Sequence, residues 1–171
     1  MESLVLKLVL IIKRKGMMRI NNYNSYEDTI NHKQEVENVL CYICDVLSKR
    51  AVDHDNSKLE SPEKEIFDLY TPKLKNTTYG SDEYKNYLKE MQVALKHHYS
   101  NNSHHPEHHK NGIKDMDLVD LIEMIADWYA ATKRHDDGNI IKSLEINQSR
   151  FNYSDELKQI FTNTINNFDL K

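Results

Sequence analysis

The sequence predicts an all-α fold, organised as a single helical bundle domain. Strand signals are scarce, because the chain has only 4 glycines in 171 residues and no Asn-Gly turn between alternating apolar runs. Helical periodicity recurs instead, with apolar residues three or four positions apart over long stretches. A chain of this length fits one domain, and its 39% apolar content is enough for one core.

The composition predicts a soluble, cytoplasmic protein, and it leaves the oligomeric state open. Charged residues make up 29% of the chain, and the mean hydropathy is −0.76. The net charge of −4 argues against a dedicated nucleic-acid binder. Cys41 and Cys44 are predicted to be buried structural thiols in a reducing compartment, since no second pair of zinc ligands lies nearby in sequence.

Residues 1–20 are predicted to be an N-terminal extension ahead of the helical domain, residues 21–171. The apolar run LVLKLVLII is shorter than the roughly 20 residues that a membrane-spanning helix needs. Its three basic residues follow the run, which is the reverse of a signal peptide. Two methionines come next, so the first residues are interpreted as an extension ahead of a natural start. A short interfacial anchor is the alternative.

The first strong helix is predicted from Glu27 to Arg50. Its apolar residues recur at helical spacing and define one inward face: Val36, Val39, Leu40, Ile43, Val46 and Leu47. His32 lies four residues before Val36, so it is expected on the same face, one turn earlier.

Two further helices are predicted to begin at serine caps. Ser61 followed by Pro62 is typical of a helix start, with serine at the N-cap and proline at the first helical position. Residues 71–80 are predicted to form a loop. Ser81 then caps a helix that runs to the pair His97–His98.

Residues 100–115 are predicted to form the loop before the second strong helix, Asp117–His135. The apolar stripe of this helix consists of Leu118, Leu121, Ile122, Ile125 and Tyr129. A line of charged residues flanks the stripe: Asp120, Glu123, Asp127 and Arg134. Ser154 and Asp155 open the last predicted helix.

Residues 97–109, HHYSNNSHHPEHH, hold six of the chain's 9 histidines. Imidazoles bind metals and carry protons near neutral pH, so this segment predicts one wall of a metal site. A solvated His-rich loop is the alternative. His104–His108 also spells H-x-x-E-H, a zinc motif that needs both histidines on one helical face. Pro106 disfavours a helix through the motif, so we reject that interpretation.

Metal-ligating residue types also occur in three other predicted elements. The full set in chain order is His32, His54, Asp55, His98, His104, His105 and Asp127. Neutral imidazoles hold a divalent metal without cancelling its charge, and a carboxylate can bridge two metals. Water held between two metals loses a proton near neutral pH and becomes a nucleophile. We therefore expect one or two divalent transition metals, and this ligand set accommodates Mn, Fe, Co, Ni or Zn.

The residue order H…HD…H…HH…D resembles the signature of the HD-domain metal-dependent phosphohydrolase superfamily. HDNSK, residues 54–58, looks like the HD-x-x-K element of several of its branches. Over nearly the whole chain, four segments look like an uncharacterised HD-like family common in bacteria and phages: RAVDHDNSKLESPE, TYGSDEYK, HHYSNNSHHPEH and MDLVDLIEMIADWYAATKRH. The resemblance implies that residues 21–171 form an all-α, HD-like helical bundle.

The resemblance also implies a role for each matching residue. The residues that match the first metal site are His32, His54, Asp55 and Asp127, with Asp55 bridging to a second metal. Those that match the extra histidines of dinuclear branches are His98 and one or both of His104 and His105. Lys58 matches a lysine that contacts substrate phosphate. The chain lacks the GYP element of the cyclic-dinucleotide branch, and Lys58 stands where the deoxynucleotidase branch often has an acid, so the substrate stays open.

The remaining polar residues receive supporting roles. Glu123 is interpreted as a carboxylate that orients an imidazole, with direct metal binding as the alternative. Asp120 is expected to be solvated or a helix-start charge. Four residues of the histidine segment are placed outside the ligand set: His97 as the alternative to its neighbour, Glu107 as a first-turn acid or proton relay, and His108 and His109 as exposed residues. The candidate phosphate binders are Lys58, Lys133, Arg134 and Arg150, although Arg134 equally suits a helix C-terminus.

These observations predict a metal-dependent phosphohydrolase that acts on a nucleotide or related phosphate ester. Metal-activated water would attack phosphorus, with Asp55, Lys58 and Glu123 as the catalytic residues. The alternatives are a non-catalytic metal- or nucleotide-binding module on the HD fold and a di-iron oxygenase-like enzyme. A nuclease is disfavoured by the acidic net charge.

Overall fold

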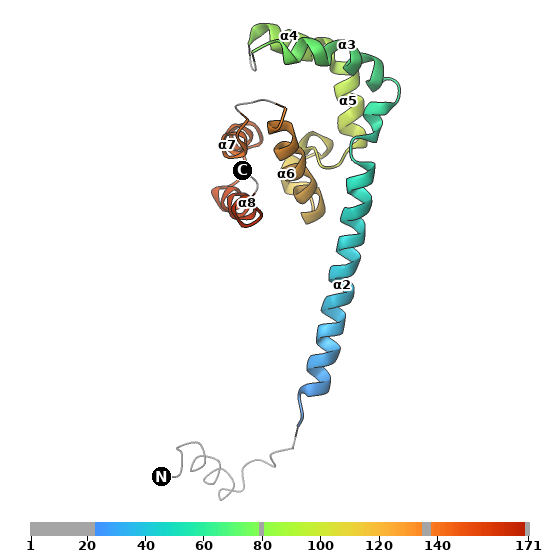
Figure 1. Ribbon diagram of the computed structural model, residues 1–171, viewed down its shortest axis with the longest axis vertical. Helices are drawn as coiled ribbons and strands as arrows, with labels where there is room; N and C mark the ends of the chain where they lie inside the picture. Colours follow the sequence, from blue (N-terminus) through green and yellow to red (C-terminus); the bar gives the residue numbers. More distant parts are fainter. Residues whose placement is uncertain (1–22, 79–80, 135–137, 170–171) are drawn as a thin grey trace, which may run out of the picture. The chain divides into compact units, whose positions relative to one another are not determined.

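The computed structural model describes residues 23–78, 81–134 and 138–169. These residues form helices joined by turns, with no strand among them, which confirms the predicted all-α fold (Figure 1). Contacts divide the chain into two compact units, residues 1–42 and residues 43–171. The predicted boundary at residue 20 lies outside the described residues. In the described part, no helix has both the length and the apolar character needed to cross a membrane.

The first described helix, α2 (Tyr26–Asp53), contributes residues to both units. It has acidic residues in its first turn and Arg50 in its last, which is the favourable order for the helix dipole. None of its residues is buried, and Cys41 and Cys44 are exposed. The predicted inward face and the predicted burial of the thiols are therefore wrong. Apolar spacing shows which residues share a face, but not whether another element covers that face.

Within the second unit, α3 (Glu63–Lys75) packs against η1 (Asn56–Leu59), α4 (Asp82–Glu90) and α5 (Gln92–Asn101). As predicted, the Ser81 side chain caps α4, accepting a hydrogen bond from the backbone N–H of Tyr84 at 3.1 Å.

The boundaries of α3 and α4 differ from the predicted ones. Pro62, not Ser61, occupies the N-cap position of α3, without a side-chain cap. The predicted loop over residues 71–80 is wrong for residues 71–75, because α3 contains Pro72 and continues past it. A proline removes one backbone donor, and near the end of a helix this loss does not stop the last turn. Met91 separates α4 from α5, where one helix was expected.

The C-terminal part begins with two short 3-10 helices, η2 (Pro106–His108) and η3 (Gly112–Asp115), followed by α6 (Leu118–Thr132), α7 (Ile140–Phe151) and α8 (Asp155–Asn167). Asp117 and Asp120 form a reciprocal capping box at the start of α6. Ser154 caps α8 as predicted. Helix α7 was not predicted, although Asn139 caps it by accepting from the backbone N–H of Lys142.

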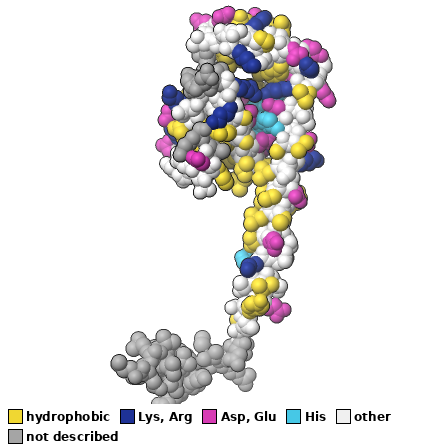
Figure 2. All heavy atoms as spheres, viewed as in Figure 1, with side chains coloured by type: hydrophobic (Ala, Val, Ile, Leu, Met, Phe, Trp, Pro, Cys, Tyr) yellow, Lys and Arg dark blue, Asp and Glu magenta, His cyan; other side chains and the backbone are white. Residues whose placement is uncertain are grey.

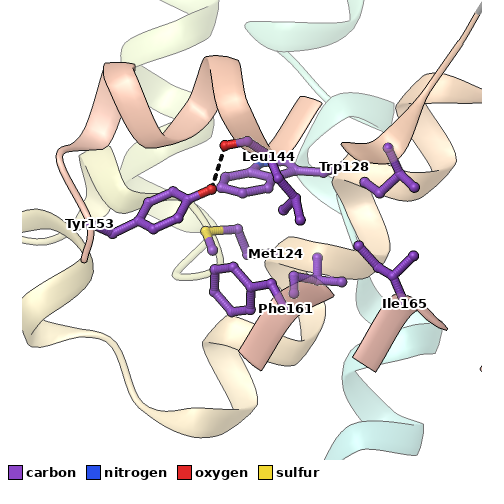
Figure 3. Packing of buried hydrophobic residues seen from close by; sticks show 8 residues of the cluster. Met124, Trp128, Leu144, Tyr153, Phe161 and Ile165 are labelled. Carbon is purple, nitrogen blue, oxygen red and sulfur yellow. Dashed lines mark hydrogen bonds between the residues drawn. The ribbon is translucent and has the colours of Figure 1, made fainter. Parts of the chain in front are cut away.

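The hydrophobic core lies where α6, α7 and α8 meet (Figure 3). Its buried members are Met124, Ile125, Trp128, Ile140, Leu144, Tyr153, Phe161 and Ile165. Full burial of a large apolar side chain contributes roughly 1.5–3 kcal/mol, so this cluster is the main source of stability in the second unit. The predicted stripe on α6 is wrong at Leu118 and Ile122, which are 77% and 50% exposed. The core face is rotated toward Met124 and Trp128, which leaves the acidic face of α6 free for other contacts.

Candidate metal centre

Among the described residues of the second unit, three groups of side chains are close enough to hold a metal ion, and two of them share Asp55. Asp55, His98, His104 and His105 form one of these two groups, and His54, Asp55 and Asp127 form the other. Within each group, one donor atom per residue lies within 4.8 Å of the others. Asp55 belongs to both groups, so its carboxylate joins them.

Local backbone structure directs the Asp55 carboxylate. Asp55 adopts the left-handed conformation, with φ of 56°, between the end of α2 and η1. The Lys58 ammonium binds Asp55 Oδ2 at 2.6 Å. The other oxygen, Oδ1, faces the Nε2 atoms of His98 at 3.3 Å and His104 at 3.5 Å. The turn therefore presents one oxygen to a lysine and the other to imidazoles.

Glu123, on α6, fixes two of the imidazoles. Its Oε1 accepts from Nδ1 of His54 at 2.8 Å and lies 3.1 Å from Nδ1 of His104. A carboxylate on Nδ1 sets the tautomer and leaves Nε2 with its lone pair available for a metal. Glu123 also forms a third group of possible metal ligands with His54 and His104. Glu123 thus contacts each imidazole at Nδ1 and not at Nε2, the nitrogen that is left for a metal.

Glu63, the first residue of α3, makes the same arrangement on the opposite side. Its Oε1 accepts from Nδ1 of His97 at 2.7 Å, and its Oε2 accepts from Nδ1 of His98 at 2.9 Å. The Glu63 side chain is 0% exposed. Sequence reasoning missed this residue, because an acid after Ser-Pro looks like an ordinary first-turn charge and nothing local indicates its burial.

Arg50 connects α2 to the acidic face of α6. Its Nη1 donates to Glu123 Oε2 at 2.9 Å and to Asp120 Oδ1 at 2.8 Å. The Ser103 hydroxyl also donates to Asp120 Oδ1, at 2.7 Å. The prediction that Asp120 is solvated is wrong, because the Arg50 guanidinium compensates the charge of this buried carboxylate. Its alternative role as a helix-start charge is confirmed by the capping box.

The separations between donor atoms suit a metal ion. With metal–ligand bonds of about 2.1 Å, adjacent donors lie about 3.0 Å apart at a right angle and about 3.4 Å apart at a tetrahedral angle. The Nε2 atoms of His98 and His105 are 2.8 Å apart, and the two imidazole contacts to Asp55 Oδ1 measure 3.3 and 3.5 Å. Asp55 Oδ1 and His104 Nε2 are buried without a hydrogen-bond partner. This donor set therefore fits a divalent transition metal.

Electrostatics keep three of these imidazoles neutral near pH 7. Burial lowers the pKa of His104, and burial together with the Lys58 charge lowers that of His98. Burial and the neighbouring imidazoles lower the pKa of His105 to about 3. A neutral imidazole is the form that binds metal, so these rings need not lose a proton first.

The other group is charged. Burial opposes ionisation of Asp127, but the His54 imidazole, 3.7 Å away, together with the other positive charges around the site, outweighs burial and lowers the pKa of Asp127 to about 2. The pKa of Asp55 is likewise lowered, because the Lys58 ammonium outweighs burial. The Asp127 carboxylate, 3.7 Å from Nε2, and the hydrogen bond to Glu123 raise the pKa of His54 to about 9. His54 would therefore release a proton on binding a metal at neutral pH.

Six of the seven predicted metal ligands are thus brought together, and His32 is not among them. His32 lies on α2 in the first unit, where its side chain is exposed, so its expected place on an inward face is wrong. His97 turns Nδ1 toward Glu63 and is absent from both ligand groups. His108 is exposed, as predicted, but His109 is half-buried and bonds the backbone carbonyl of Ser103 at 2.8 Å.

The predicted phosphate binders lie in different surroundings. Lys58 is within the centre and also lies over the Phe67 ring. Lys133 and Arg134 follow α6, are exposed, and Lys133 lies over the Tyr129 ring at 4.7 Å. The fourth, Arg150 on α7, pairs with Glu107, which lies in the first turn of η2 as predicted.

Comparison with known proteins gives one match. Residues 21–167 match the DUF5662 family, a family of unknown function, and the chain therefore belongs to this family. No curated protein and no solved structure matches the chain.

Proposed function

We propose that this protein is a metal-dependent phosphohydrolase that acts on a nucleotide or related phosphate ester. The main support is the pair of buried atoms Asp55 Oδ1 and His104 Nε2, which face each other at 3.5 Å without a hydrogen-bond partner. A buried polar atom without a partner costs roughly 1–3 kcal/mol, and a shared metal would satisfy both.

One or two ions of Mn, Fe, Co, Ni or Zn suit the imidazoles and carboxylates of the centre. When bound, such an ion would lower the pKa of its bound water to near neutral pH, and it would also polarise a phosphoryl oxygen of the substrate. The six candidate ligands are His54, Asp55, His98, His104, His105 and Asp127. Glu123 keeps the Nε2 atoms of His54 and His104 directed inward.

Lys58 is the residue best placed to bind substrate phosphate. Its ammonium lies 2.6 Å from Asp55 Oδ2, at the carboxylate shared by both ligand groups. A phosphate oxygen arriving beside Asp55 would accept a second hydrogen bond from this ammonium, which would stabilise the charge that develops during hydrolysis. Figure 2 shows Lys and Arg side chains beside histidines at the surface of this region.

Arg150 is a further candidate for the substrate contact. It interacts with the Tyr99 hydroxyl, and the Tyr99 ring packs against the His105 ring at 5.2 Å. The Arg150 guanidinium is thus separated from the candidate ligand His105 by the Tyr99 side chain. From there it could bind a second phosphate of a nucleotide in a bidentate manner. Lys133 and Arg134 remain candidates for more distal phosphates.

The test is metal content followed by phosphate release. Chelator-treated protein is reloaded with each metal in turn and assayed with nucleoside mono-, di- and triphosphates. Asp55→Ala should lose both metal and turnover, because it removes the carboxylate common to both ligand groups. Asp53→Ala is the matched control, since Asp53 is exposed and lies just two residues earlier.

The outcomes separate the alternatives. Tight metal binding without turnover on any nucleotide would favour a non-catalytic binding module. Oxygen-dependent loss of substrate with bound iron would favour a di-iron oxygenase-like enzyme. Wild-type turnover in Asp55→Ala, or no metal binding by the wild-type protein, would contradict the proposal.

A further inference from the structure

Glu63 is a buried carboxylate that none of the proposed catalytic steps uses. It opens α3, its side chain is 0% exposed, and its two oxygens accept from different imidazoles, those of His97 and His98. Burying a carboxylate at this depth is costly unless both oxygens find donors. The position is therefore built to hold this side chain in one orientation.

The consequence for His98 is geometric. With Nδ1–H donated to Glu63 Oε2 at 2.9 Å, the lone pair of Nε2 faces Asp55 Oδ1 at 3.3 Å. The Phe67 ring lies edge-on to the His98 ring, with 6.1 Å between centroids. The Asn102 amide lies 3.1 Å from the same Nδ1. Rotation of the ring would break the bond to Glu63 within this packed setting.

His97 supports Glu63 and does not face the centre. Its Nδ1 lies 2.7 Å from Glu63 Oε1, and its side chain is 41% exposed. The Asn101 amide approaches both ring nitrogens, at 3.3 and 3.4 Å. Adjacent histidines on α5 thus point at the same carboxylate, but only His98 has its second nitrogen among the candidate ligands.

We propose that Glu63 is a positioning residue that holds Nε2 of His98 toward the metal position formed with Asp55, His104 and His105. This inference rests on the proposed metal site. It divides the centre between two carboxylates: Glu63 orients His98, and Glu123 orients His54 and His104. Such partners of metal ligands commonly change metal affinity or activity by about 10–100-fold when they are removed.

The decisive variant is Glu63→Gln in the full-length chain. Glutamine has nearly the same shape, but an NH2 group with two N–H donors replaces one of the two carboxylate oxygens, so it cannot accept at both the Oε1 and the Oε2 position. Glu65→Gln is the matched control, because it removes the same charge from an exposed position on the same helix. Circular dichroism establishes that each variant is folded.

Cobalt(II) is the probe, measured by equilibrium dialysis and by its visible absorption. We expect Glu63→Gln to weaken cobalt binding at the His98 position about 10–100-fold and to change the absorption spectrum. Glu65→Gln should match the wild type in both measurements. If Glu63→Gln fails to fold, Glu63→Asp keeps the charge but is too short to reach both imidazoles, and the same weakening is expected.

A second pair of variants tests the assignment of the two histidines. His98→Ala should lose one bound cobalt, whereas His97→Ala should keep the wild-type stoichiometry. The reverse result would overturn the inference. So would unchanged cobalt affinity and spectrum in a folded Glu63 variant when the wild type binds cobalt. A wild-type protein that binds no cobalt would instead overturn the metal site itself, and the inference with it.

Discussion

Helix α6 has a buried apolar face and a partly buried acidic face, and different interactions stabilise the two. One face carries Met124, Ile125 and Trp128, which pack into the core with α7 and α8 (Figure 3). The other carries Asp120, Glu123 and Asp127 toward Arg50 and the histidines. Apolar burial needs no particular partner, so the core face is complete within the chain. Each carboxylate on the acidic face requires a specific cation or imidazole.

This difference explains where polar atoms remain unpartnered. Among the described residues, Asp55 Oδ1 and His104 Nε2 are buried side-chain atoms without a hydrogen-bond partner, and both lie beside the acidic face. The buried hydroxyl on the core face, that of Tyr153, donates to the carbonyl of Leu144. We infer that the core face determines the free energy of unfolding, whereas the acidic face contributes to a site whose buried polar atoms would be satisfied by a ligand.

The largest expected effect is on the core face. Phe161 is 3% exposed and packs its ring against Trp128 and Tyr153, at centroid distances of 6.4 and 5.6 Å. Phe161→Ala should lower the free energy of unfolding by about 3–5 kcal/mol, because it leaves a cavity among close-packed rings. Urea unfolding followed by circular dichroism measures this loss. A loss below about 1 kcal/mol would show that the core does not depend on this cluster.

The next effect separates the two faces through a metal. Cobalt at about 100 times its dissociation constant should raise the free energy of unfolding by roughly 2.7 kcal/mol, because it binds only the folded chain. Phe161→Ala should keep this increment, and Asp127→Asn should lose most of it, since Asp127 belongs to a ligand group. The measurement is urea unfolding with and without cobalt. An equal increment in both variants would contradict the division between the faces.

Local signals made much of the fold predictable. Ser81 and Ser154 cap helices as expected, because a cap depends on residues within one turn. The exposed face of α2 was not predictable, since periodicity says nothing of what covers a face. Helix α7 was not predicted, although the signal at its start is local: Asn139 accepts from the backbone N–H of Lys142.

The candidate site was predictable in its residue types and not in its supports. His98, His104 and Asp55 stand out because imidazoles and carboxylates are the residue types that bind divalent transition metals, and the histidines are clustered in sequence. Glu63 and Arg50 have no such signal, because their roles depend on burial beside partners far away in sequence. The sequence therefore indicates the atoms that could touch a metal, while the structure is needed to see what orients them.

The pH dependence of the metal-free protein is the third expected effect. Burial lowers the pKa of His105 to about 3 in the folded chain. As the pH falls through 6.5, this imidazole therefore becomes protonated in the unfolded chain while it stays neutral in the folded chain. Stability should fall by about 2 kcal/mol between pH 7 and 5 for one imidazole kept neutral. His54, with its pKa raised to about 9, contributes stability below pH 6.5 that is lost as the pH rises toward 9.

Chelator-treated protein should therefore be most stable near pH 6.5 to 7. Urea unfolding between pH 5 and 9 measures the profile. A flat profile from pH 7 to 5 would mean that the His105 imidazole is as free to take a proton in the folded chain as in the unfolded one. Phe161→Ala should shift the whole profile downward without moving its maximum, because the core face carries no titrating group in this range.

The smallest expected effect is that of Tyr153→Phe. The Tyr153 hydroxyl donates to the carbonyl oxygen of Leu144 at 2.6 Å, and burial raises its pKa to about 12, so the hydroxyl is neutral throughout the range tested. The substitution removes one neutral hydrogen bond and little volume, which should cost about 0.5–1.5 kcal/mol in urea unfolding. Cobalt affinity should equal that of the wild type. Because the variant changes only the core face, any change in cobalt affinity would mean that the two faces of α6 are coupled.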